Sequence, residues 1–253
     1  YRKNTKPETK WANWKRLFSS LTVVALAASA SYANAADVTS ETELKAAISA
    51  GDTNITIPAN TVITLTSALP EIGYNTVISG AADGSSVIDG ASSYTAFSIA
   101  SNATVTIKGL TIQNTYLALV DLAGTQKGGA AIYNQGTLTV EECHFANNKV
   151  DGSVAVAARG GAVYSTGTLN LLYSSFFSNM SEGGDTITDG AGRPVSLSTV
   201  GRGGALYIEN QGTVQNCTFS GNTAKGGDGH GKDPDIAGGA GAHAYGGAIA
   251  VAA

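Results

Sequence analysis

Charge and proline are both scarce in this sequence of 253 residues. Only 13% of the residues are charged and five are proline, whereas 32 are glycine. The net charge is -4, and no cluster of lysine or arginine follows residue 16. Because nucleic-acid binding needs a basic surface, we expect no nucleic-acid partner. The low charge also excludes the composition of a disordered polymer, so short strands joined by tight turns are predicted.

A long hydrophobic run is missing as well. The longest apolar stretch, within residues 17–35, has about 14 residues, and a membrane-spanning helix needs about 20. This stretch follows two basic residues and ends in small residues, with a cleavage site between Ala35 and Ala36. We therefore predict a secretory signal peptide over residues 1–35 rather than a membrane anchor, and we expect an exported chain.

One pattern occurs three times in the rest of the chain. In each copy a phenylalanine follows the first glycine by 16 residues, and an asparagine follows that phenylalanine by three. The copies begin at Gly129, Gly160 and Gly203 and contain Phe145 and Asn148, Phe176 and Asn179, and Phe219 and Asn222. Because both the Gly-to-Phe and the Phe-to-Asn spacing recur in all three copies, the sequence indicates a solenoid, in which each coil is buried against its neighbours. A fourth start at Gly246 does not reach the end of the pattern, so we expect this chain to be a piece of a longer one.

Aligning the copies on their phenylalanines places inward-facing residues in columns. The columns contain Leu138, Val140, Cys143 and Phe145, then Leu169, Leu171, Ser174 and Phe176, then Gly212, Val214, Cys217 and Phe219, with Val105, Ile107, Leu110 and Ile112 upstream. Short strands of period two predict a parallel β-helix, with Phe stacked on Phe and Asn hydrogen-bonded to Asn in a ladder. The two cysteines share a column but lie about 9–10 Å apart by strand spacing. A disulfide cannot span that distance, so we predict two buried free thiols.

The glycine pairs and the segments between copies complete the predicted coil. Corners are expected where glycine accepts a positive φ and lets coils pack closely, at Gly160 and Gly161, Gly203 and Gly204, and Gly246 and Gly247. The four starts are 31, 43 and 43 residues apart, and the extra residues always fall between the asparagine and the next glycine pair. We therefore predict variable loops at 149–159, 180–202 and 223–245, on one side of the coil.

The region before the repeats is predicted to cap the solenoid. Ser40 and Glu43 fit a capping box that begins a short helix. Its apolar face contains Leu44, Ala47 and Ile48. The predicted organisation is a signal peptide over 1–35, a cap and first coils over 36–100, and repeated coils over 101–253.

The two signatures of these copies resemble those of the polymorphic outer-membrane protein family, first recognised in chlamydiae: Gly-Gly-Ala followed by Ile, Leu or Val, and Phe-x-x-Asn. They stand here as GGAV at 160, GGAL at 203 and GGAI at 246, whereas the first copy departs with GGAA at 128. The resemblance covers about residues 100–253. It implies an all-β, right-handed parallel β-helix of the pectin-lyase-like type, the hand that the crossover rule also favours.

The same resemblance implies where such a chain works. It implies a passenger exported to the surface of a Gram-negative bacterium through a C-terminal outer-membrane β-barrel, which would lie beyond Ala253, and often an adhesin. Membrane association is expected only through that barrel. The expected partner is a glycan or protein on a host cell or another surface.

Enzymes of the pectinase type also use this fold and are the main alternative. GHG at 229–231 and TDG at 188–190 are similar to fragments of polygalacturonase motifs. Hydrolysis of that kind needs carboxylates converging on one cleft, but the sequence has no Asp-Asp pair, and Asp189 and His230 lie in Gly-rich insertions. A lyase would need a carboxylate cage for Ca²⁺ and a basic residue. After the signal region the only arginines are Arg159, Arg193 and Arg202, all near loops, and no carboxylates are spaced along one strand face to partner them.

Metal sites are not predicted either. The stretch 226–243 contains aspartates and histidines, but it lacks the nine-residue repeat of calcium-binding solenoids, and whether it binds Ca²⁺ stays open. Three histidines without ligand spacing do not indicate zinc. We predict no catalytic residue, cofactor or metal site. Three hypotheses therefore remain: a non-enzymatic adhesin, which we favour, a polysaccharide lyase or hydrolase, and a purely structural surface protein.

Overall fold

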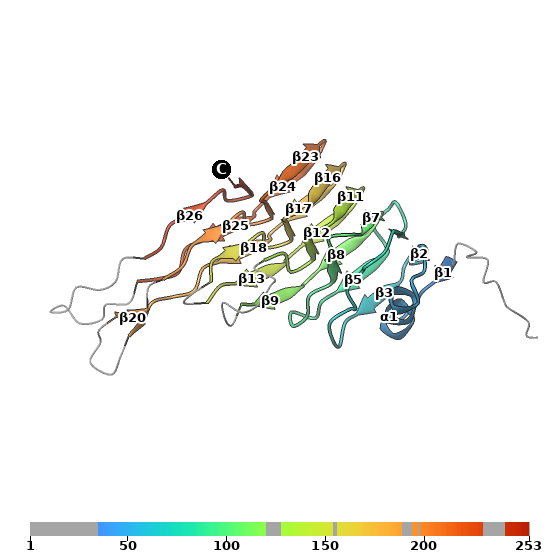
Figure 1. The fold of residues 1–253 in the computed structure, drawn as a ribbon, viewed down its shortest axis with the longest axis horizontal. Helices are drawn as coiled ribbons and strands as arrows, with labels where there is room; N and C mark the ends of the chain where they lie inside the picture. The colour runs from blue at the N-terminus through green and yellow to red at the C-terminus, as the bar shows by residue number, and fades with distance from the viewer. Residues whose placement is uncertain are drawn as a thin grey trace, which may run out of the picture. The chain divides into compact units, whose positions relative to one another are not determined.

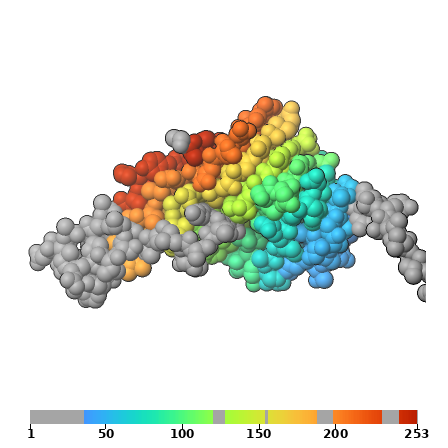
Figure 2. Space-filling model, viewed as in Figure 1, coloured from blue at the N-terminus to red at the C-terminus, as the bar shows by residue number. Residues whose placement is uncertain are grey.

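A computed structural model describes residues 35–119, 128–153, 156–188, 194–196, 198–229 and 241–252. Over these residues short parallel strands recur along the chain, and within each parallel sheet a strand pairs with the equivalent strands of the neighbouring coils. Figure 2 shows the coils as adjacent bands from blue to red. The predicted signal peptide, apart from Ala35, lies outside the described residues.

Five parallel sheets run along this stack of coils. Sheet A contains β1 (Ala35–Asp37), β2 (Asn54–Thr56), β4 (Thr76–Ser79), β7 (Thr104–Lys108), β11 (Thr137–Glu141), β16 (Thr168–Leu172) and β23 (Gln211–Gln215). Sheet B contains β3 (Val62–Thr64), β5 (Val87–Asp89), β8 (Thr111–Gln113), β12 (His144–Ala146), β17 (Ser175–Phe177) and β24 (Thr218–Ser220). Sheet C contains β6 (Phe97–Ile99), β10 (Ile132–Asn134), β15 (Val163–Ser165), β22 (Leu206–Ile208) and β27 (Ile249–Val251).

Two smaller sheets are formed by strands that come after the position of the repeat asparagine in each coil. Sheet D contains β9 (Tyr116–Ala118), β13 (Lys149–Asp151), β18 (Met180–Glu182) and β25 (Thr223–Lys225). Sheet E contains β14 (Ala158–Arg159), β21 (Gly201–Arg202) and β26 (Ala244–Tyr245). An antiparallel pair, β19 (Ile187–Thr188) and β20 (Pro194–Ser196), lies apart from the coils.

The helix expected before the coils is α1 (Glu41–Ala50). The Ser40 hydroxyl accepts a hydrogen bond from the Glu43 N–H, as predicted, but the Glu43 carboxylate accepts from Thr39, at 2.8 Å from its backbone nitrogen, rather than from Ser40. Gly51 ends the helix with φ of 79°. The helix buries Leu44, Ala47 and Ile48 as predicted. These side chains join the same core as the first strands, so α1 covers the apolar core beside β2 and β3 (Figure 1).

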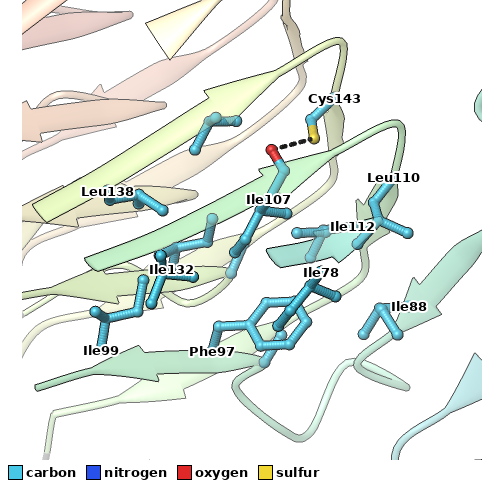
Figure 3. Packing of buried hydrophobic residues seen from close by; sticks show 14 of the residues in the cluster. Ile78, Ile88, Phe97, Ile99, Ile107, Leu110, Ile112, Ile132, Leu138 and Cys143 are labelled. Carbon is cyan, nitrogen blue, oxygen red and sulfur yellow. Dashed lines mark hydrogen bonds between the residues drawn. The ribbon is translucent and has the colours of Figure 1, made fainter. Parts of the chain in front are cut away.

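The predicted columns are the register of the sheets. Leu138 pairs with Val105 on one side and Leu169 on the other, and Val140 pairs with Ile107 and Leu171. Because side chains alternate along a strand, these residues point inward in every coil and form one continuous core, part of which Figure 3 shows. The three-residue offset in each copy is a corner between sheets A and B, where Gly109, Glu142, Tyr173 and Asn216 all have positive φ.

The phenylalanine and asparagine columns form the expected stack and ladder. The Phe176 ring lies 4.5 Å from that of Phe145 and 4.8 Å from that of Phe219, with interplanar angles of 7° and 9°. Asn179 Nδ2 donates to Asn222 Oδ1, and Asn148 Nδ2 donates to Asn179 Oδ1, both at 2.9 Å. Each asparagine thus satisfies backbone and side-chain groups of the neighbouring coil, which fixes the stacking register.

The two glycines of each corner have different roles. Gly160 has φ of 56°, which suits glycine. Gly161 has no such φ, but a Cβ there would lie 2.2 Å from the carbonyl oxygen of Gly204, so this position is glycine because the coils approach closely. In the first copy, which departs from the full GGA signature, Ala130 is the equivalent of Gly161, and its N–H donates to the Gly161 carbonyl.

The cysteines are free, as predicted, but they differ in burial. Cys143 is fully buried, and its Sγ lies 3.5 Å from the carbonyl oxygen of Ile107 (Figure 3). Ser174 occupies the intervening coil and accepts from the Cys143 N–H. Cys217 is only half-buried, so the prediction of two fully buried thiols is wrong for this residue. It lies beside β23 and β24, the last strands of sheets A and B in the described residues, where less chain covers the core.

Candidate functional site

The variable segments leave and rejoin the coil at fixed places. β13, β18 and β25 pair in register before each segment, and β14, β21 and β26 pair in register after it. The predicted loops therefore include ordered strands at both ends, which corrects their boundaries to 152–157, 183–200 and 226–243. Six residues connect the two sheets in the first case, and 18 do so in each of the others.

Glycines at the base of the inserted segments let neighbouring segments pack backbone to backbone. A Cβ on Gly183 would lie 1.8 Å from the carbonyl oxygen of Thr199, and one on Gly184 would lie 2.4 Å from that of Ser153. The Thr199 hydroxyl accepts from the Gly184 N–H and donates to the Ser153 carbonyl, both at 2.8 Å. Gly227 N–H donates to the Thr199 carbonyl, so Thr199 joins three successive segments.

A row of alternating charges lies on the outer face of sheet D, next to these segments. The Lys149 ammonium is 2.8 Å from Asp151 Oδ1 and 3.0 Å from Glu182 Oε2. Lys225 is 2.8 Å from the other Glu182 oxygen, and the Tyr116 hydroxyl donates to Asp151 at 2.9 Å. Asp151, Glu182 and Lys225 occupy the same register position in three coils.

The electrostatics of this row favour ionised carboxylates. Hydrogen bonds from Lys225, and then from Lys149, outweigh partial burial and lower the pKa of Glu182. Burial, together with the hydrogen bond to Asp151, raises the pKa of the Tyr116 hydroxyl. Since the two ammonium groups favour the charged form of Glu182, this carboxylate is poorly suited to donate a proton at neutral pH.

A cavity of about 270 Å³ opens beside this row. It is lined by Asp151, Gly152, Glu182, Gly183, Gly184 and Asp185. The expectation of no converging carboxylates is wrong, because stacking brings together acidic residues that are far apart in the chain. The sequence does carry one indication of this, because Asp151 and Glu182 each follow the repeat asparagine of their copy by three residues.

The other sequence candidates do not assemble into a site among the described residues. Asp189 and His230 lie outside those residues. The Asp228 carboxylate lies 3.5 Å from the Lys225 ammonium, and the His243 ring lies 6.3 Å from the Tyr245 ring between centroids. Across the described ranges no group of three His, Cys, Asp or Glu side chains could hold a metal ion.

A second group of polar and aromatic residues lies where sheet E turns into sheet C. The rings of Tyr133, Tyr164 and Tyr207 stack along sheet C and are buried. The guanidinium of Arg159 lies 5.8 Å from the Tyr207 ring centroid, and its Nε is 3.8 Å from Glu209. Burial and a hydrogen bond to Glu209 raise the pKa of Tyr164. These buried tyrosines tie two sheets together.

Among the described residues, the stacked parallel strands and the in-register columns define a parallel β-helix, which α1 caps. A family model described as a right-handed β-helix region matches residues 46–248. The chain belongs to this family, and the predicted right-handed all-β fold is confirmed. Searches of curated proteins and of solved structures gave no match. In the part of the chain that the structure describes, no helix is long and apolar enough to cross a membrane.

Proposed function

We propose that this chain is the passenger of an exported surface protein of a Gram-negative bacterium, of the polymorphic outer-membrane type, and that it acts as a non-enzymatic adhesin. In this proposal the coils are a scaffold, and the segments 152–157, 183–200 and 226–243 form the binding face for a glycan or protein on another surface. The GGA and FxxN signatures support the family assignment, and the apolar stretch before Ala36 supports export.

One observation carries the proposal. In the first of these coils six residues span the gap between sheets D and E, while the next two coils use 18 residues for the same gap. Twelve residues in each of the longer segments are therefore unnecessary for closing the coil. Solenoids commonly carry their recognition in such insertions on one face.

The test is to replace residues 183–200 with the six residues 152–157 and to measure binding to fixed epithelial cells and to a glycan array. We expect binding to fall at least tenfold while the circular dichroism spectrum is unchanged. A matched control exchanges the outward strand residues Thr168 and Asn170 for serine, far from the insertion. Unchanged binding after the segment replacement would contradict the proposal, and absence of any binding by the parent chain would favour a purely structural surface protein.

The acidic cavity is the one observation that favours a polysaccharide-active enzyme. Asp151, Glu182 and Asp185 line it together, as paired carboxylates do in glycoside hydrolases. The lysines bound to Asp151 and Glu182 oppose this alternative. Incubation with polyuronates and neutral glycans, followed by reducing-end and unsaturated-product assays, tests it, and turnover that is lost in Glu182→Gln would replace the adhesin proposal.

A further inference from the structure

Two large aromatic side chains are exposed on one coil of sheet B and its corner. Tyr173 is 58% exposed and Phe177 is 57% exposed. In the adjacent coils Glu142 and Asn216 occupy the corner position of Tyr173. Ala146 and Ser220 pair with Phe177 in the register of the sheet. The repeat therefore folds with polar or small residues at both positions, and its architecture does not require these rings.

Folding alone disfavours the two rings. Tyr173 has φ of 50°, a left-handed conformation that is costly for a bulky side chain and more easily adopted by asparagine. The corner hydrogen bond of Tyr173, from its N–H to the carbonyl of Gln215, uses only backbone atoms. An unfavourable backbone conformation combined with exposed apolar surface is typical of a binding position.

The surroundings of the rings are polar and largely uncharged. Ser175 lies between them in sequence and points to the same outer face as Phe177, and its hydroxyl is 2.6 Å from Nδ1 of His144. The outward residues of β12, β17 and β24 are His144, Ala146, Ser175, Phe177, Thr218 and Ser220, with no lysine, arginine or carboxylate among them. Two carboxylates of the preceding coil lie near this corner, that of Glu141, which pairs with Leu172 in the register of sheet A, and that of the exposed Glu142.

The geometry points to a binding site for a neutral glycan at Tyr173 and Phe177. A pyranose ring presents polarised C–H groups on one face and hydroxyls around its edge, so it can stack on the electron-rich face of an aromatic ring and exchange hydrogen bonds with Ser, Thr and His side chains. The negative charge of Glu142 disfavours acidic sugars, and no cation on these strands would attract them. A standard protein interface buries about 800 Å² on each partner around an apolar centre, whereas the outward neighbours of these two rings include the hydroxyl groups of Ser175, Thr218 and Ser220.

This site deepens the proposed adhesive function, on which it rests, but it is separate from the inserted segments. The probes are cellohexaose, an N-acetyllactosamine oligosaccharide and, as an acidic comparison, hexagalacturonate. Saturation-transfer NMR reports which sugar protons contact the protein, and calorimetry gives the affinity. We expect transfer to ring C–H protons of at least one neutral probe, and weaker binding of hexagalacturonate.

The test variant is the double substitution Tyr173→Asn and Phe177→Ser, which installs the residues that the next coil already carries. We expect it to fold with unchanged or higher stability and to bind the neutral probe at least fivefold more weakly, from the loss of two stacked rings. The matched control is Val62→Thr, which removes an equally exposed apolar side chain, 58% exposed on β3 of the same sheet, and should leave binding unchanged.

The outcomes separate this site from the inserted segments. Replacing residues 183–200 should leave the saturation-transfer signal intact even where cell binding falls. If no neutral probe binds, or if the double variant binds as the parent does, the glycan site is wrong whatever the result for the inserted segments. If the double variant loses cell binding on protease-sensitive receptors but binds no sugar, the site recognises protein and the proposal is overturned.

Discussion

Replacing Asn179 with alanine tests the asparagine ladder at its centre. The side chain accepts from the Asn148 N–H at 3.1 Å and from Asn148 Nδ2 at 2.9 Å, and it donates to the Phe145 carbonyl at 3.0 Å and to Asn222 Oδ1 at 2.9 Å. Asn222 Oδ1 keeps a second donor, the Asn179 N–H. The substitution therefore leaves two buried donors and one carbonyl without these partners.

An unsatisfied buried polar group costs about 1–3 kcal/mol, so we expect a loss of about 4 kcal/mol in the free energy of unfolding. The assay is urea unfolding followed by circular dichroism. The control is Asn170→Ala in the same coil, an outward-facing residue of β16, which should change stability by less than about 0.5 kcal/mol. A loss below about 1 kcal/mol for Asn179→Ala would refute the argument that the ladder holds the coils in register.

Three further predictions concern packing, protonation and thiol chemistry. Gly161→Ala should lower the free energy of unfolding by about 3 kcal/mol or more, because the added methyl group would overpack against the backbone. Gly221→Ala should lower it by only about 1 kcal/mol, because Gly221 has a positive φ but more open space around it. Urea unfolding measures both values, and equal losses would contradict this distinction between the two glycines. Because the pKa of Glu182 is lowered in the folded chain, its stabilising contribution is complete above about pH 4.5 and is lost as the pH falls further, so the melting temperature of Glu182→Gln should depend less on pH below 4.5 than that of the parent. A thiol reagent should label half-buried Cys217 in the native chain but label Cys143 only after denaturation, since burial raises its pKa to about 12; early labelling of Cys143, seen by mass spectrometry, would argue against its burial.

The coil core was predictable from the sequence because stacking repeats a local pattern. Each phenylalanine and asparagine contacts its equivalent in the next coil, so one spacing found three times is enough to specify the register of Phe145 with Phe176. The start and the apolar face of the helix followed in the same way from Ser40 and three apolar residues. Its second cap bond was less predictable, because the Glu43 carboxylate can reach either of two adjacent backbone N–H groups.

The outer faces were less predictable because their contacts join residues from different coils. Three of the four strands of sheet D lie inside the predicted loops, since three-residue strands such as β13 carry too few residues to show a period. The ion pairs of Glu182 with Lys149 and Lys225 cross two coil boundaries, 33 and 43 residues apart in the chain. Aligning the copies already places Tyr173 and Phe177 opposite polar or small residues, but the sequence alone did not show that both rings are exposed.

The most direct test of the account is the binding of the chain in which residues 183–200 are replaced by the six-residue connection 152–157, measured together with its unfolding. The account predicts an unfolding free energy within about 3 kcal/mol of the parent, because the replacement removes the hydrogen bonds of Thr199 but none of the coil core, and at least tenfold weaker binding to cells. Retained binding, or a replaced chain that no longer folds, would contradict the division into a constant scaffold and a variable binding face.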